Sequence, residues 1–234
     1  MVINILIILM EINTIKDFKK LNKNVTHLTF GYWFNKKIKL SNKITHLTFG
    51  VFNKKIKLSQ NVTHLTFGVS FNQKIKLSNR ITHLTFGVNF NQKIKLSNRI
   101  THLTFGINFN QKIKLSNKIT HLTFGYDFNQ KIKLSNGITK LNIEYIFNKK
   151  IKISQNITYL IFGNKLSYYF MSNTLFKPHC EFIKNTIIPN HTIIIYHGNI
   201  SNIYNFNFNN FPLNKHNKMN IKERLLHFNS INVS

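Results

Sequence analysis

The chain has 234 residues, which is enough for one ordinary domain with its own hydrophobic core. It carries 33 Lys and Arg against 6 Asp and Glu, a net charge of +27, and this balance predicts attraction to a polyanion or an acidic surface. The single cysteine, Cys180, excludes an internal disulfide and a multi-cysteine metal site, and it favours an intracellular location.

The chain opens with an apolar stretch at residues 2–10. This stretch is shorter than the roughly 20 apolar residues that span a bilayer. It also lacks the basic residues and the small-residue cleavage site of a signal peptide. We therefore expect residues 1–24 to form an N-terminal cap and no membrane span, with membrane association or export as the alternative.

Residues 25–163 contain a repeated block, THLTFG. The block begins at Thr26, Thr45, Thr63, Thr82, Thr101 and Thr120, and degenerate copies begin at Thr139 and Thr158. Successive copies are 19 residues apart, except that the step from Thr45 to Thr63 is 18. A period near 20 predicts a solenoid, because each coil is too small to bury its own apolar face and stacking joins these faces into one core.

Within each copy apolar and polar residues alternate, which indicates strands and leaves no helical period. In the fourth copy Leu84 and Phe86 alternate with His83 and Thr85, and the later segment KIKL alternates in the same way. We expect one strand from THLTF and a second, shorter extended piece from KIKL, each pairing in parallel with its equivalent about 4.8 Å away. The predicted fold is mainly β, a right-handed solenoid of about 8–9 coils with parallel strands stacked coil on coil.

Two positions after the strand are the same in seven copies. The phenylalanines should be buried and stack as a spine: Phe34, Phe52, Phe71, Phe90, Phe109, Phe128 and Phe147. The asparagines that follow them should bond free backbone groups at a turn, in their own coil or the next: Asn35, Asn53, Asn72, Asn91, Asn110, Asn129 and Asn148. The glycine that ends the block suits a positive φ or a tight corner.

The histidine of the block becomes Lys140 and Tyr159 in the degenerate copies, which indicates an exposed position. We predict that this exposed strand face binds a protein partner through two rows: His27, His46, His64, His83, His102 and His121, with Thr29, Thr48, Thr66, Thr85, Thr104 and Thr123. Metal binding or a response to pH near 6.5 is an alternative for the histidines. Because Lys140 and Tyr159 interrupt the row, we predict no metal and no cofactor.

Equivalent lysines of the KIKL segment form a third row, one residue per coil: Lys39, Lys57, Lys76, Lys95, Lys114, Lys133 and Lys152. A line of positive charge suits a nucleic-acid backbone or another polyanion, and sequence-independent binding of this kind is the alternative function. Solvated lysines that keep strand edges apart are the structural alternative. AT-rich coding, which raises Lys, Asn, Ile and Phe together, explains the composition equally well.

After Gly163 the repeat fades. We expect residues 164–200 to form a degenerate repeat and a C-terminal cap, because residues 188–198, IPNHTIIIYHG, echo LSNRITHLTFG. Residues 201–234 are an Asn-rich tail that we expect to be loosely ordered, with a short helix around residues 221–228.

The segments FNQKI and LSNRITHLTFG resemble the signature of the FNIP repeat proteins, known mainly from social amoebae and giant DNA viruses and regarded as related to leucine-rich repeats. The resemblance runs from about Phe18 to Gly163. It implies a curved rod with the THLTF strands lining one face. The usual repeat of this family is a few residues longer and has Pro where this chain has Lys37, Lys74 and Lys93. Some members carry an F-box, for which the opening twenty residues are too short, so no ubiquitin-ligase role is expected.

The sequence shows no catalytic constellation. Its acidic residues are scattered, and it has no Gly-rich phosphate loop, nucleophile elbow or zinc signature. His179 precedes Cys180, but adjacency in sequence is no evidence of a catalytic dyad. We therefore predict a non-enzymatic repeat scaffold that mediates protein–protein interaction; the sequence specifies neither the partner nor the oligomeric state.

Overall fold

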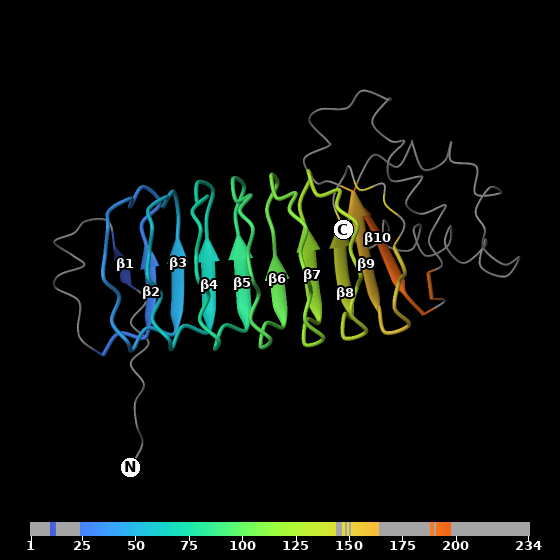
Figure 1. The fold of residues 1–234 in the computed structure, drawn as a ribbon, viewed down its shortest axis with the longest axis horizontal. Helices are drawn as coiled ribbons and strands as arrows, with labels where there is room; N and C mark the ends of the chain where they lie inside the picture. The colour runs from blue at the N-terminus through green and yellow to red at the C-terminus, as the bar shows by residue number, and fades with distance from the viewer. Residues whose placement is uncertain are drawn as a thin grey trace, which may run out of the picture.

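The computed structural model describes residues 10–12, 24–143, 147, 149, 151–163, 188–189 and 191–197. Ten strands form a single sheet in chain order, and every neighbouring pair is parallel (Figure 1). The strands are β1 (Met10–Ile12), β2 (His27–Phe30), β3 (His46–Phe49), β4 (His64–Phe67), β5 (His83–Phe86), β6 (His102–Thr104), β7 (His121–Phe124), β8 (Lys140–Ile143), β9 (Tyr159–Gly163) and β10 (Ile193–His197). The described residues contain no helix, and therefore none that could cross a membrane.

Strands β2 to β9 come from the eight copies of the block, so about seven complete turns of the chain separate the first from the last. Equivalent residues lie opposite one another, as His83 and His102 do in β5 and β6. The shorter step keeps this register, since His46 lies opposite His64. The parallel, coil-on-coil solenoid predicted from the sequence is therefore confirmed.

The core forms from the inward positions of each coil. In the fourth copy Leu84 and Phe86 are each 1 % exposed and Phe90 is 0 % exposed. The ring of Phe90 stacks on Phe86 within its coil, with centroids 3.7 Å apart, and faces Phe109 of the next coil at 6.1 Å. The seven phenylalanines after the turn are all buried, so one continuous aromatic spine joins the coils.

The asparagine after each of these rings links one coil to the next. The Asn91 backbone N–H donates to Asn72 Oδ1, and the Asn110 N–H donates to Asn91 Oδ1, both at 3.0 Å. Gln111 Nε2 adds a second donor to Asn91 Oδ1 at 3.0 Å. The same backbone contact recurs at each coil from Asn53 to Asn129. Each asparagine side chain therefore accepts a hydrogen bond from the backbone of the next coil and not from its own. Asn148 lies outside the described residues.

The glycine that follows the strand is needed for close approach of two backbones. A Cβ on Gly87 would lie 2.3 Å from the carbonyl oxygen of Gly68 and 2.4 Å from its carbon. No positive φ accompanies this contact. The explanation by a positive φ is therefore wrong, and the space between neighbouring coils is the physical reason for glycine here.

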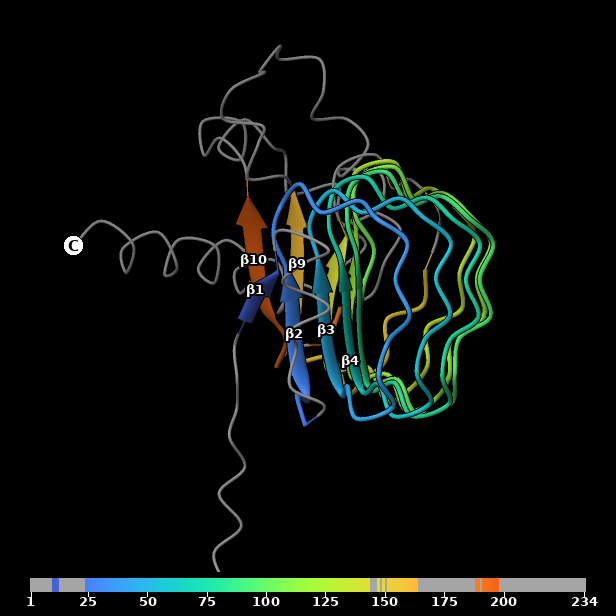
Figure 2. The same ribbon diagram turned by 90° about the vertical axis from the view of Figure 1, so that its left-hand side faces the viewer.

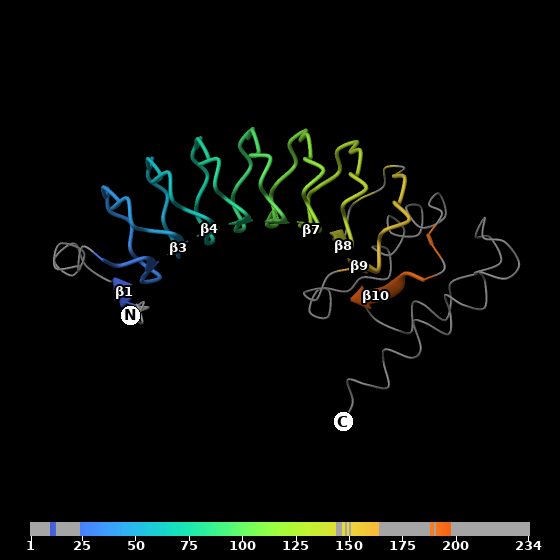
Figure 3. The same cartoon turned by 90° about the horizontal axis from the view of Figure 1, so that it is seen from below.

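The KIKL segment does not form the second ladder that its alternation predicts. Among the described residues no strand covers these segments, although their inward residues, such as Ile94 and Leu96, pack against the core. We call the stretch between the two turns of a coil, residues 90–97 in the fourth copy, the back segment. Figure 2 shows strands and back segments on opposite sides of the coil, and Figure 3 shows that the back segments fan apart on the outside of an arch. Because curvature separates neighbouring back segments, their backbones do not pair as those of the strands do.

Several predictions fall on parts of the chain outside the described residues. These are most of the N-terminal region 1–24, residues 164–187 with Cys180, and the tail 201–234 with its short helix. Strand β10 lies in the region predicted to contain a degenerate repeat and pairs with β9, with Ile193 opposite Tyr159.

Candidate functional site

The inner side of the arch, which we call the concave face, is formed by the outward side chains of β2 to β7 (Figure 3). Two rows follow it, with every member half-buried: His27, His46, His64, His83, His102 and His121, and Thr29, Thr48, Thr66, Thr85, Thr104 and Thr123. The strand register places each residue opposite its equivalent in the next coil. The structure thus brings together all twelve residues of the predicted partner face.

The six imidazole rings stack face to face along the sheet. Neighbouring ring centroids are between 3.8 and 4.2 Å apart, and the ring planes differ by 11–17°. Each ring covers the next, which explains why the histidines are half-buried and not fully exposed. The substitutions among the copies identify the surface position, but they do not reveal this stacking, which depends on the register between strands.

A threonine at the start of each block holds the histidine ring in place. Thr82 Oγ1 lies 2.9 Å from His83 Nδ1 and 3.2 Å from the backbone oxygen of Thr63 in the preceding coil. The threonines directly before β3, β4, β6 and β7 make the same pair of contacts. Sequence reasoning did not assign a role to this threonine, although its constant place beside the histidine is a signal for it. Since Nδ1 is engaged here, Nε2 is the ring nitrogen that remains for a ligand.

Burial and neighbouring charge both disfavour protonation of four histidines of the row. Desolvation is the larger cause that lowers the pKa of His46, His64, His83 and His121 below the usual 6.5, and repulsion from neighbouring imidazoles is the second. For His121 the ammonium group of Lys140 contributes as well. The neutral form of these four histidines is therefore favoured in the folded chain.

The geometry of the row does not suit a metal ion. Stacked, nearly parallel rings direct their nitrogen lone pairs along parallel lines, whereas a metal requires ligands that converge on one point. Within the described part of the chain no group of three His, Cys, Asp or Glu residues is arranged to hold a metal ion. What the concave face offers is a regular surface with one imidazole and one hydroxyl group per coil.

The back segments carry the positive charge. Every described lysine of the predicted row is exposed: Lys39, Lys57, Lys76, Lys95, Lys114, Lys133 and Lys152. A second row of exposed lysines lies two residues before it: Lys37, Lys55, Lys74, Lys93, Lys112 and Lys131. Asp127 is the only acidic residue between Asn24 and Ile143, and it lies in a turn. The outer side of the arch is therefore basic and almost without compensating charge.

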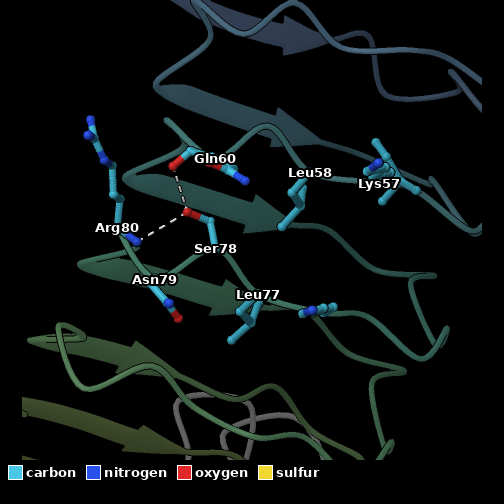
Figure 4. A pocket seen from close by; sticks show the side chains of 9 residues that line it. Lys57, Leu58, Gln60, Leu77, Ser78, Asn79 and Arg80 are labelled. Atoms are coloured by element: carbon cyan, nitrogen blue, oxygen red, sulfur yellow. Dashed lines mark hydrogen bonds between the residues drawn. The ribbon is translucent and has the colours of Figure 1, made fainter.

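One groove opens between the back segments of the second and third coils, with a volume of about 550 Å³. Leu58 and Leu77 line the groove, one from each coil. Ser78 Oγ donates a hydrogen bond to the Gln60 backbone oxygen at 2.8 Å. Figure 4 shows Lys57 and Arg80 at opposite ends of this groove. Lys76 also lines the groove, so both coils contribute cations to it.

The stacked parallel strands, the phenylalanine spine and the asparagine row define a β-solenoid of the leucine-rich-repeat type. The crystal structure of CroV588, described as a novel circular LRR protein, from the giant virus CroV, is similar to the chain with a TM-score of 0.58 and 40 % sequence identity. The match covers 74 % of this chain and 27 % of that protein, so the chain spans about a quarter of its length. The FNIP Repeat family matches residues 52–79, 71–96, 90–127 and 109–136. Residues 52–136 of the chain therefore consist of FNIP repeats, and no curated protein matches the chain in sequence.

Proposed function

We propose that the chain is a non-enzymatic scaffold whose concave face binds a protein partner. The observation that supports this is the unbroken pair of histidine and threonine rows over β2 to β7. A partner segment that crosses the strands meets the same imidazole and hydroxyl group at each coil, so many weak contacts add along one surface. Because imidazole and hydroxyl groups bind through hydrogen bonds, the partner segment is polar. The single cysteine supports an intracellular location.

The test compares one change on each side of the arch. His83→Glu places a carboxylate within the stacked row, and Lys95→Gln makes the same one-unit change in charge on the back. A partner is first identified by affinity purification with the full chain and is then titrated, as a purified protein, against each variant. We expect His83→Glu to weaken binding at least tenfold and Lys95→Gln to leave it unchanged.

The folded state of both variants is checked by their urea unfolding midpoints. Equal binding by His83→Glu and the unchanged protein would contradict the proposal. So would a loss of binding confined to Lys95→Gln, which would place the partner on the back.

A second candidate function, binding of a polyanion, is favoured by the two exposed lysine rows and by the near absence of acidic residues in the described coils. Lysines that neutralise phosphates release the counterions bound there. The logarithm of the affinity should therefore fall linearly with the logarithm of the salt concentration. Retention of a labelled oligonucleotide at low and moderate NaCl concentrations measures this. Failure to retain it at low salt would rule this function out.

A further inference from the structure

We infer that the lysine-covered back binds single-stranded nucleic acid, laid along the outside of the arch, in preference to a duplex. This inference rests on the second candidate function and adds the kind of polyanion to it. It follows from three observations: the lattice of lysines, the direction of curvature and the composition of the back segments.

The lysines form a two-dimensional lattice. Within one coil the two exposed lysines, such as Lys93 and Lys95, are two residues apart in an extended segment, or roughly 7 Å. From coil to coil each row repeats at about 4.8 Å or more, because the back segments fan apart from the strand spacing (Figure 3). A polymer that follows the rows therefore meets two ammonium groups at every coil.

Curvature decides which polymer can use the lattice. The lysines lie on the convex side, so a straight rod touches the surface only where it is tangent (Figure 3). A DNA duplex has a persistence length of about 500 Å, and over an arch of some tens of ångströms it is straight. A single strand is flexible enough to follow the curve and to place phosphates beside lysines of successive coils. Since the electrostatic affinity grows with the number of neutralised phosphates, the single strand should bind more tightly.

The contacts should be to phosphate and not to bases. The phenylalanines of the back segments are buried. Exposed aromatic side chains lie elsewhere, Tyr32 and Trp33 in a turn and Tyr159 in β9. Base stacking needs an exposed aromatic platform, which the described back segments do not provide. Binding should therefore be independent of sequence, because phosphate contacts fix position without reading bases.

The experiment uses the full chain and fluorescence anisotropy. The probes are a labelled 30-nucleotide single strand of mixed sequence and the 30-base-pair duplex that contains it, titrated from low to moderate NaCl concentration. We expect the single strand to bind at least fivefold more tightly at the same salt concentration. The slope of log affinity against log salt should be about 0.7 per phosphate contacted by the strand.

A matched pair of variants locates the site. Lys95→Gln with Lys114→Gln removes two charges from the back, and Arg99→Gln with Lys118→Gln removes two exposed charges from the turns of the same coils. The first variant should reduce the single-strand slope by about 1.4, twice the value for one contact, and the second should leave it unchanged. Unfolding midpoints establish that both variants are folded.

The remaining outcomes distinguish polyanion binding from the preference for single-stranded nucleic acid. Equal or tighter binding of the duplex would overturn the preference for a single strand while leaving polyanion binding intact. No binding of either probe at low salt would overturn both. Inorganic polyphosphate should compete with the single strand, because both present phosphates on a flexible chain, and failure to compete would overturn the assignment of the contacts to phosphate.

Discussion

The environment of each inner histidine of the row is formed by the equivalent histidines of the two neighbouring coils. His83 is covered by His64 and His102, with ring centroids 4.2 Å away on both sides. The replacement of this residue by lysine and tyrosine in later copies predicts a surface position, and the structure places it on the concave face. Its half-burial and its lowered pKa could not be predicted, because both arise from rings that lie 19 residues apart in the sequence.

The histidine row should make the stability of the fold depend on pH. His46, His64, His83 and His121 have folded-state pKa values below the usual 6.5, so the unfolded chain takes up protons more readily. Stability from the row is fully present above pH 6.5 and is lost as the pH falls from 6.5 through the folded-state values. We expect the urea midpoint to be lower at pH 5 than at pH 7.5.

The control for this experiment replaces the titrating groups. His64→Gln combined with His83→Gln removes two of the four shifted groups from the centre of the row. The difference between the midpoints at the two pH values should become smaller in this variant. An unchanged difference would show that histidines elsewhere in the chain cause the pH dependence.

In the asparagine row, the contribution of a single acceptor atom to stability can be tested. Asn91 Oδ1 receives the backbone N–H of Asn110 and the side-chain amide of Gln111, both at 3.0 Å. Asn91→Leu removes this acceptor and leaves the donors unpaired, at a cost of about 1–3 kcal/mol in the free energy of unfolding. Asn91→Asp keeps an oxygen in place and should cost clearly less. Chemical denaturation measures both, and equal losses would argue against this role for the oxygen.

At the scale of the element, the sequence predicts the strands well and the back segments poorly. The THLTF strands follow from alternation together with a constant period, and both signals are local. The KIKL segment alternates equally well but forms no ladder, because pairing requires a neighbouring backbone at the right distance. That distance is set by the curvature of the whole arch, which no single copy of the repeat encodes.

The end of each strand provides a test of how tightly the coils approach. Gly87→Ala would place a methyl group 2.3 Å from the Gly68 backbone oxygen, and the coils would have to separate to accept it. We expect a loss of about 1–3 kcal/mol, as for other overpacking changes. Asn89→Ala, an exposed change two residues later, should stay within about 0.5 kcal/mol. Equal stabilities in urea would mean that the backbones can move apart without cost.

At the scale of the whole molecule, the two sides of the arch carry different functional groups. The strands and the back segments lie on opposite sides of the coil (Figure 2). The strands present imidazole and hydroxyl groups, and the back segments present ammonium groups. The rows on both sides could be predicted from the sequence, because each row needs only the repeat and its register. Which side is concave could not be predicted from the residues alone, and this curvature decides which ligands can follow the lysines.

The charge of the back predicts how salt affects stability. The chain has a net charge of +27, and folding brings the lysines of successive coils close together. Salt shortens the range of this repulsion, from about 30 Å at 0.01 M to about 8 Å at 0.15 M ionic strength. We expect the thermal unfolding midpoint to rise with NaCl concentration over this range. The rise should be smaller in the variant that combines Lys95→Gln with Lys114→Gln. Circular dichroism measures it, and a midpoint that falls with salt would contradict this account.

The shortened copy shows how this architecture can change its length. Between Thr45 and Thr63 one residue is missing, yet His46 still lies opposite His64 and Phe52 is still fully buried. The turn absorbs the deletion, so a change in one coil does not propagate to the next. A gene that encodes such a chain can gain or lose whole units by unequal recombination, and each product would still stack. The number of histidine and lysine positions on either side of the arch can then change while the fold is kept.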